Sequence, residues 1–416
     1  MKRITACLLI ACLALTLFSA CGAEVPSPQN TAGTTEAAEV TGEIQTVPEE
    51  SAESPAEESA SAPASEPAVP EKPAAEMIDM PSLLKEHDVN EIALTINGVE
   101  INWGEYYYWL AQGVNYVGSF IDMYKQYGME ITWQDYLEED LTMAEFVIEY
   151  AEENILQIAA IKLVAEENGV ELGDDTEEHY IQQKTFAAYE ILGPDATMEE
   201  FDEFLLEEYG GDMGIRSAII HSFLWEETLK EIYGEKGEKI ENLDGVLNEH
   251  EVWRANHILL MTTDLDESGI EEKKALADKI YTELSAIKDK KALVERFEEL
   301  KEEYCEDTGK VSYPHGYTFE KGVMVSSFED TTKELPVYGL SEPVESEYGY
   351  HIILRMPYDG EETVLTGNSY LSGSTTGYYA AYLLYEELTM SKIETLNIER
   401  AAGFDGIKIA DYILEK

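Results

Sequence analysis

The stretch that decides the fold runs from Trp253 to Arg355. It opens with ANHILL at 255–260 and closes with SEPVESEYGYHIILR at 341–355. Each segment contains an apolar run typical of a buried strand, and each run carries one histidine at an edge, His257 or His351. Between them lie a helical pattern and the run KGVMVSSFED at 321–330. We therefore expect two strands, far apart in sequence, within one small α+β domain.

This pattern resembles the parvulin, or PpiC-type, peptidyl-prolyl isomerase domain. The resemblance implies an α+β fold over 247–357, in which helices pack on an antiparallel sheet of about four strands. It also implies an enzyme, a peptidyl-prolyl cis-trans isomerase (rotamase), that needs no cofactor and no metal ion. The sequence itself shows no His, Cys and Asp cluster at metal-ligand spacing.

Four residues match the catalytic positions of that family. His257 and His351 match its paired histidines, whose strands lie side by side beneath the site. Asp307 falls where parvulins carry Cys or Asp, close to the amide that rotates. Ser346 matches the Ser or Thr that hydrogen-bonds within the histidine network. The alternative for both histidines is a buried structural pair whose polar atoms are satisfied by neighbours.

Four further residues match substrate-binding positions. Met324 and Phe328 match the proline pocket, and because they are four residues apart they would share one face of a short helix. Leu259 would add to the floor of the pocket. Tyr348, with Gly349, would form the turn that leads into the strand over the pocket.

The chain departs from the family in two loops. Parvulins usually carry Gly-Gly-Asp-Leu-Gly after the acidic loop, whereas this chain has YPHGYTF at 313–319. The acidic loop itself reads YCED at 304–307, so a two-residue slip would put Cys305 at the catalytic position in place of Asp307. The sequence therefore does not decide which residues form this wall of the pocket or which residue is preferred before proline.

The chemistry of such a site differs from that of a hydrolase. Rotation about an X–Pro bond has a barrier of roughly 20 kcal/mol, because amide resonance must be broken. No nucleophile is required. A catalyst needs an apolar slot that grips the proline ring and surroundings that favour the twisted, less dipolar amide over the planar one.

The N-terminus predicts export. Lys2 and Arg3 precede an apolar run over 4–18, and Ser19 and Ala20 then lead to Cys21. We interpret 1–20 as a lipoprotein signal peptide and Cys21 as the acylated (diacylglycerol and palmitate) residue, although Phe18 stands where Leu is usual. The alternative is an ordinary secretory signal. Acylation would attach the chain to the cell membrane, through the lipid bilayer, on its extracytoplasmic face.

Residues 21–81 are interpreted as a disordered acidic linker of Pro, Ala, Ser and Glu. From 22 to 80, thirteen acidic residues face one lysine, and there is no aromatic residue. The whole chain has a net charge of −57. Such a charge argues strongly against nucleic acid or an anionic membrane surface as a partner and favours cationic or weakly charged unfolded proteins. The resemblance to the isomerases implies that the partners are unfolded or newly exported proteins with X–Pro bonds. The sequence does not decide whether the chain forms a homodimer.

Residues 82–246 show a mostly helical pattern after one hairpin. Two apolar runs flank Asn97 and Gly98, which tolerate the positive φ of a tight turn. Helices are expected from Trp103, with Asn102 as N-cap, and over 143–168, 176–192, 197–209 and 213–233. The hairpin, the helix with the run ILQIAAIKLVAEENGV at 155–170 and the acidic helices after it are similar in order to the N-terminal chaperone region of SurA and PrsA foldases.

Aromatic residues are dense in that region. Four consecutive rings, from Tyr106 to Trp109, would cover every side of a helix. We therefore expect that they do not all face the core and that some line a client-binding surface. The alternative is ordinary core packing of an amphipathic helix.

The chain continues past the isomerase pattern. A helix over 375–389 and an apolar run over 407–414 are expected to pack back on the helical region, so that 82–246 and 358–416 form one chaperone domain with 247–357 inserted. The alternative is an independent small hairpin. The main alternative function is a non-catalytic holdase whose parvulin domain only binds peptide. A lipoprotein solute receptor fits less well, because strands and helices do not alternate.

Overall fold

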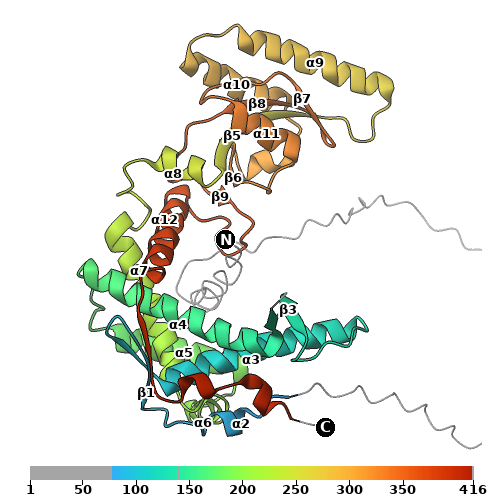
Figure 1. The fold of residues 1–416 in the computed structure, drawn as a ribbon. Helices are drawn as coiled ribbons and strands as arrows, with labels where there is room; N and C mark the ends of the chain where they lie inside the picture. The colour runs from blue at the N-terminus through green and yellow to red at the C-terminus, as the bar shows by residue number, and fades with distance from the viewer. Residues whose placement is uncertain (1–76, 139, 415–416) are drawn as a thin grey trace, which may run out of the picture.

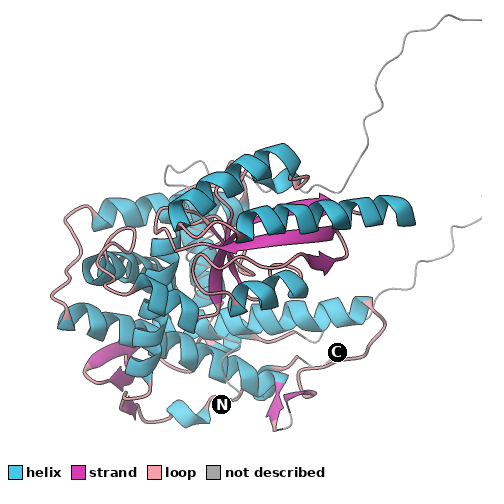
Figure 2. Cartoon of the chain, turned by 90° about the horizontal axis from the view of Figure 1, so that it is seen from above, coloured by secondary structure: helices cyan, strands magenta, loops and turns pink. Residues whose placement is uncertain are grey.

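The computed structural model describes residues 77–138 and 140–414. The predicted signal peptide, Cys21 and most of the predicted linker lie outside these residues. In Figure 1 a helical body occupies the lower part of the molecule and a smaller domain with a sheet lies above it. Seen from above in Figure 2, the sheet and its helices lie in front of the helical body. No helix in the described ranges is long and apolar enough to cross a bilayer.

The first half of the chain forms most of the helical body. Its elements are α2 (Met80–Leu83), β1 (Ile92–Ile96), β2 (Val99–Asn102), α3 (Trp103–Gln126), β3 (Tyr136–Glu138), β4 (Leu141–Thr142), α4 (Met143–Glu167), α5 (Thr176–Leu192), α6 (Met198–Tyr209), α7 (Met213–Tyr233) and α8 (Leu243–Glu249).

The sheet domain and the return to the helical body follow. Their elements are β5 (Val252–Met261), α9 (Glu267–Ser285), α10 (Lys290–Tyr304), the 3-10 helix η1 (Thr308–Val311), β6 (Tyr317–Glu320), α11 (Ser326–Glu334), β7 (Val344–Ser346), β8 (Gly349–Arg355), β9 (Val364–Leu365), α12 (Thr376–Ile393), β10 (Ile398–Arg400), η2 (Phe404–Gly406) and η3 (Ile409–Tyr412).

Local sequence signals set the starts of several helices. Asn97 and Gly98 have φ of 47° and 91° in the turn between β1 and β2, as expected for this hairpin. Asn102 caps α3 together with Glu105, because each side chain accepts a backbone N–H of the other residue. The same reciprocal capping begins α4 and α6. The predicted helices over 143–168, 176–192, 197–209 and 213–233 are confirmed within one residue.

The expectation for the four consecutive rings was wrong. Tyr106, Tyr107, Tyr108 and Trp109 are all buried, with at most 4% of each side chain exposed. They can all be buried because α3 has packing partners on every side: it contacts α4, α6, α7 and the hairpin of β1 and β2. Tyr106 packs on Phe404 and Tyr108 on Tyr209, with ring centroids 4.7 Å and 5.3 Å apart. None of the four rings is exposed on the outer surface: all are packed inside the helical body, where Tyr108 and Trp109 also border an internal cavity.

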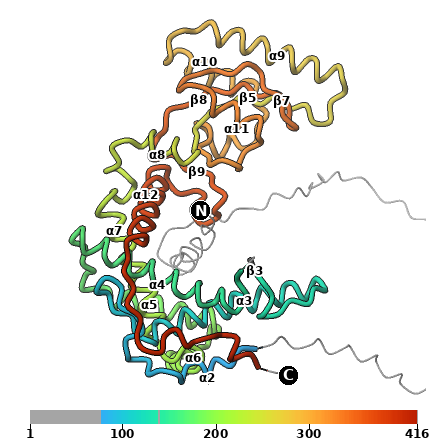
Figure 3. Tube along the Cα trace, in the orientation of Figure 1, coloured from blue at the N-terminus to red at the C-terminus, as the bar shows by residue number. Residues whose placement is uncertain are grey.

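The C-terminal segment returns to the first helices, as expected for an inserted domain. Strand β10 pairs antiparallel with β1, so that one sheet joins residues about 300 positions apart. Helix α12 packs on α4 and α7. Figure 3 shows the red end of the trace running back beside the blue N-terminal elements. The independent hairpin is therefore wrong, and the apolar run over 407–414 forms a 3-10 turn, η3, against α4.

The inserted domain is built on a five-stranded sheet of order β7-β8-β5-β6-β9. The first four strands form the antiparallel sheet expected from the sequence. The additional strand, β9, lies beyond residue 357 and pairs parallel with β6. Helices α9 and α10 cover one face of the sheet, and α11 covers the other. Strands β5 and β8 are buried along nearly their whole length, because helices lie on both faces.

Close packing of α3 against α7 generates a stability prediction. A methyl group at Gly214 of α7 would clash with the Cβ atom and ring of Tyr108 on α3. We expect Gly214→Ala to lower the free energy of unfolding by ~1–3 kcal/mol, because overpacking moves rigid helices apart. Urea denaturation followed by circular dichroism measures this change.

The matched control is Gly118→Ala in α3. A methyl group there has its nearest neighbour, a ring carbon of Trp133, at 3.8 Å. Because alanine is more favourable than glycine inside a helix, the free energy of unfolding of this variant should rise by ~0.5–1 kcal/mol. A Gly214→Ala variant as stable as the wild type would contradict the close approach of the two helices.

Candidate active site

The pairing of β5 with β8 brings the two histidines together. Across this antiparallel pair, His257 lies opposite Ile353 and Leu259 lies opposite His351. The histidines are thus diagonal neighbours on one face of the sheet. Their ring centroids are 5.3 Å apart at an interplanar angle of 76°, and both side chains are buried.

Asp307 stands beside the first histidine. Its Oδ2 atom lies 3.3 Å from Nε2 of His257 and accepts a 2.6 Å hydrogen bond from the hydroxyl of Tyr317. Its Oδ1 atom accepts the Gly309 N–H at 2.9 Å, at the start of η1. Burial alone would raise the pKa of Asp307, but the His257 imidazole, the Tyr317 hydroxyl and the Gly309 N–H hold it well below its ordinary value. The carboxylate is therefore ionised.

Tyr317 is a site residue that sequence reasoning missed. Its ring stacks on that of His257, with centroids 5.7 Å apart and planes 14° apart. Burial and the bond to Asp307 raise the pKa of its hydroxyl. It belongs to the loop that departs from the family pattern, which concealed its role. A signal was present nonetheless, because Tyr317 and Phe319 alternate on a strand whose partners are Ala255 and Trp253.

Cys305 has different surroundings. The thiol is buried, 3.4 Å from the Leu259 backbone nitrogen and 3.7 Å from the His257 carbonyl oxygen. Burial raises the pKa of this thiol, so it stays protonated at neutral pH. Of the two candidates in the acidic loop, Asp307 is the one whose side chain contacts the His257 imidazole.

The second histidine has its own partner. Oγ of Ser346 lies 2.7 Å from Nε2 of His351 and also accepts the Tyr348 N–H at 3.1 Å. Burial lowers the pKa of His351 to about 4, with a smaller contribution from His257. The His351 ring is therefore neutral at physiological pH.

Phe328 packs against both histidines. Its ring centroid is 5.2 Å from that of His257 and 5.7 Å from that of His351. The side chain is 2% exposed and belongs to a hydrophobic cluster with Trp253, Phe319 and Ile353. The sequence therefore identified an aromatic residue that lies directly against the paired rings.

The placement of Met324 corrects one expectation. Helix α11 begins at Ser326, so Met324 precedes the helix and does not share a helical face with Phe328. The turn that contains Met324 is held by Glu329, whose buried carboxylate accepts the N–H groups of Gly322 and Met324 at 2.8–3.0 Å. Met324 is half-buried and still packs on the cluster around Phe328.

Leu259 and Tyr348 lie at the borders of the site. Leu259 is buried opposite His351 but packs in the cluster of α9 and α10, with Cys305, and not in the cluster of Phe328. Tyr348 is 47% exposed in the turn between β7 and β8, and its carbonyl accepts the Thr262 N–H. Within the described residues, no group of three or more His, Cys, Asp or Glu side chains could hold a metal ion.

The buried state of His351 has a measurable consequence. Its folded pKa of about 4 lies below the ordinary 6.5, so as pH falls through this range the unfolded chain takes up a proton before the folded chain does. The buried neutral ring of His351 therefore contributes fully to the free energy of unfolding above pH 6.5. As the pH falls from 6.5 to about 4, this contribution decreases by ~1.4 kcal/mol per pH unit. Histidine NMR on the whole chain should show one ring titrating near pH 4.

Loss of that signal in His351→Gln would assign it to this residue. If the assigned signal instead titrated near pH 6.5, the ring would be in contact with water and the description of a buried neutral histidine would be wrong.

Comparisons with known proteins agree with this geometry. Residues 257–356 match the family model described as the PPIC-type PPIASE (rotamase) domain. Foldase protein PrsA of Caldanaerobacter subterraneus is 29% identical over 280 residues, which cover 65% of this chain and 74% of that protein. Foldase protein PrsA 1 of Bacillus cereus is 38% identical over 102 residues, or 24% of this chain and 29% of that protein.

Other similarities are more remote. Chaperone SurA of Chromohalobacter salexigens is 36% identical over 102 residues, covering 24% of this chain and 21% of that protein. The crystal structure of PrsA from Bacillus subtilis is 16% identical and covers 63% of this chain and 91% of that chain, with a TM-score of 0.23. The chain therefore carries a PpiC-type peptidyl-prolyl isomerase domain and is, by its similarity to these proteins, a PrsA/SurA-like parvulin isomerase.

Proposed function

We propose that this chain is a lipid-anchored extracytoplasmic foldase that catalyses cis/trans isomerisation of X–Pro bonds in exported proteins and that binds unfolded clients, as a chaperone does, through its helical body. The observation that carries the proposal is the constellation around Phe328: two buried histidines on adjacent strands, one beside Asp307 and the other beside Ser346. In this proposal His257, Asp307, His351 and Ser346 form the catalytic network.

The substrate proline would be held by apolar side chains. Phe328 and Met324 belong to the cluster on the same face of the sheet as the histidines. Leu259 would support this region from the sheet, and the exposed ring of Tyr348 would lie near the peptide chain that enters the site. Gripping the ring orients the bond that must rotate and removes water from around it.

The electrostatics of the site favour rotation. A planar amide carries partial negative charge on its carbonyl oxygen, and twisting reduces this dipole. The ionised Asp307 carboxylate would repel a planar carbonyl more strongly than a twisted one, so it would lower the barrier without proton transfer. Since His351 is neutral, it does not cancel that charge.

Supporting observations for the foldase setting come from outside the site. The relatives with the longest alignments are named foldases, and another is named a chaperone. The N-terminal sequence has a signal-like segment that ends at Cys21, and an acidic linker follows it. The alternative, a non-catalytic holdase, requires the same helical body but no turnover at the histidine site.

A matched pair of phenylalanine variants tests the proline pocket. Phe328→Leu should reduce X–Pro turnover of the whole chain at least tenfold, because it removes the ring that lies against both histidines. Met324→Ala and Asp307→Ala should also reduce turnover, and Met324→Ala should do so at least as strongly as Asp307→Ala, because the site depends on its apolar grip more than on proton transfer. A coupled assay on a proline tetrapeptide measures the turnover.

Phe297→Leu is the control. Phe297 is fully buried in the cluster beneath α9 and α10, on the opposite face of the sheet, so its truncation costs stability but leaves the pocket intact. All variants should suppress aggregation of an unfolded client as well as the wild type does. A wild-type chain that suppresses aggregation but shows no turnover would establish the holdase alternative.

The lipid anchor makes a separate prediction. Cys21→Ser should abolish acylation and release the chain from the membrane fraction, because the mature chain would be attached only through the modified thiol. Metabolic labelling with a fatty-acid analogue and detergent partitioning measure this. Labelling that persists in the variant would show that Cys21 is not the acylated residue.

A further inference from the structure

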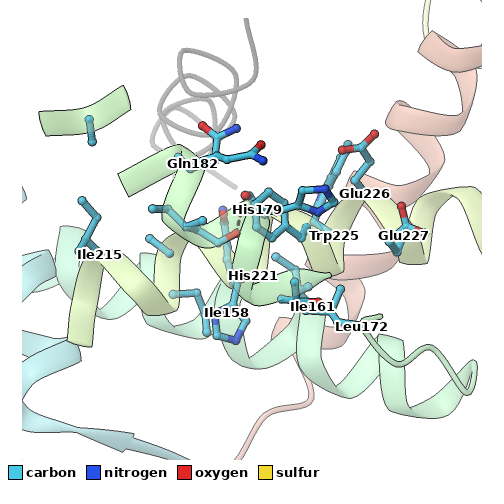
Figure 4. A pocket seen from close by; sticks show the side chains of 18 of the residues that line it. Ile158, Ile161, Leu172, His179, Gln182, Ile215, His221, Trp225, Glu226 and Glu227 are labelled. Atoms are coloured by element: carbon cyan, nitrogen blue, oxygen red, sulfur yellow. Dashed lines mark hydrogen bonds between the residues drawn. The ribbon is translucent and has the colours of Figure 1, made fainter. Parts of the chain in front are cut away.

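The helical body contains a large cavity apart from the histidine site. Its volume is about 1020 Å³, and its walls come from α3, α4, α5, α6, α7, α12 and the loop over 171–173. Figure 4 shows Ile158 and Ile161 below it, Ile215 at the left, and Trp225 and Glu226 at the upper right. This volume is at the upper end of the range for small-molecule pockets, so the cavity can accommodate a short peptide segment.

Aromatic and aliphatic side chains form much of the wall. Trp109 of α3, Trp225 of α7 and Tyr382 of α12 line the cavity. The rings of Trp225 and Tyr382 pack at a centroid distance of 5.8 Å, so this part of the wall is held by contacts between helices. Rigid rings of this kind suit apolar side chains and also attract cations to their faces.

The charges of the wall are almost all negative. Among the described residues, six acidic side chains line the cavity, Glu171, Asp175, Glu190, Glu226, Glu227 and Glu386, against one lysine, Lys230. Lys230 already pairs with Glu226 at 2.8 Å and with Glu227 at 3.1 Å. Burial lowers the pKa of His221 to about 3, so that ring adds no positive charge. The acidic side chains of the wall therefore outnumber the positive groups that could neutralise them.

Polar atoms on the wall lack partners. Among the described residues, Nε1 of Trp109, Oε1 of Gln183 and Nε2 of His221 are buried without a hydrogen-bonding partner, and all three side chains line the cavity. Buried polar atoms are normally paired. These three atoms are themselves shielded from solvent, so they mark incomplete polar packing within the wall and do not contribute to the recognition of a ligand.

We propose that this cavity binds short segments of unfolded client proteins that combine apolar side chains with lysine or arginine. This inference rests on the client binding in the proposed function and adds the class of segment and its site. The apolar side chains would pack on the aromatic wall, and the cation would lie near the carboxylates of α7 and α12. A segment with acidic side chains would meet like charge in a partly dehydrated space, which is costly.

Glu386 supports the choice of a cation. Burial raises its pKa to about 7, and the Trp225 side chain hydrogen-bonds to it. A carboxylate in such surroundings is stabilised when a positive charge comes close. The net charge of −57 further disfavours acidic segments at longer range.

The test compares three peptides of one length on the whole chain. They have the same apolar residues and carry lysine, glutamine or glutamate at two fixed positions. Fluorescence anisotropy at about 0.15 M salt, where exposed charges are screened beyond about 8 Å, gives the three dissociation constants. We expect the lysine peptide to bind at least tenfold more tightly than the glutamate peptide.

Two charge-matched double variants locate the preference. Glu226→Gln with Glu386→Gln should reduce the lysine advantage to threefold or less, since both side chains line the cavity. Glu203→Gln with Glu207→Gln removes the same charge from the exposed surface of α6 and should leave the advantage unchanged.

The other outcomes would contradict the preference for cations, the cavity as its site, or client binding by the helical body. Equal binding of the three peptides would leave client binding in place and overturn the preference for cations. A lysine advantage that survives Glu226→Gln with Glu386→Gln would assign the preference to the overall charge and overturn the cavity as its site. Binding of none of the peptides would overturn client binding by the helical body, while the isomerase assignment would be unaffected.

Discussion

The antiparallel pairing of β5 with β8 is the constraint on which the active site depends. Side chains alternate between the two faces of a sheet, so a slip of one residue would move His351 to the face covered by α9 and α10. Both strands are buried and apolar, which makes any such slip costly. The observed register places the two rings 5.3 Å apart with Phe328 against both.

The same two strands also connect the inserted domain to the helical body. At their outer ends, Arg355 donates to the Thr332 carbonyl, to Asn248 and to the hydroxyl of Tyr358. Tyr358 in turn donates to the Val252 carbonyl. Arg254 donates to the Pro357 carbonyl and lies 3.3 Å from Glu362. Buried charged groups need such partners, so the entering and leaving segments are held in one arrangement.

Negative charge has a different role in each part of the molecule. At the histidine site one carboxylate, Asp307, is held by two hydrogen bonds beside His257, and the neighbouring His351 is neutral. In the helical body, several carboxylates share a cavity with aromatic rings, and a single lysine compensates part of their charge. The proposed functions would require this difference. Catalysis at the histidine site needs one negative charge at a defined position, whereas client binding in the cavity needs only a general attraction for cationic segments.

Much of the fold could be predicted from the sequence because its signals are local. Asn97 and Gly98 specify their turn by allowed φ values, and Asn102 with Glu105 begins α3 through capping. The strand-like runs around His257 and His351, with Phe328 between them, pointed to the right domain. Tyr317, in contrast, meets Asp307 only through the folding of a loop whose sequence departs from the family pattern.

What the sequence by itself determined was the type and extent of most helices, the hairpin, the excess of acidic residues and the two histidine strands, since each follows from neighbouring residues or from the period of the apolar pattern. Only the tertiary structure decided that all four rings from Tyr106 to Trp109 are buried, that Met324 precedes its helix, and that several helices of the described residues line one cavity. These features depend on which elements surround a residue. Such packing is set by contacts between segments far apart in the chain, and no local pattern records it.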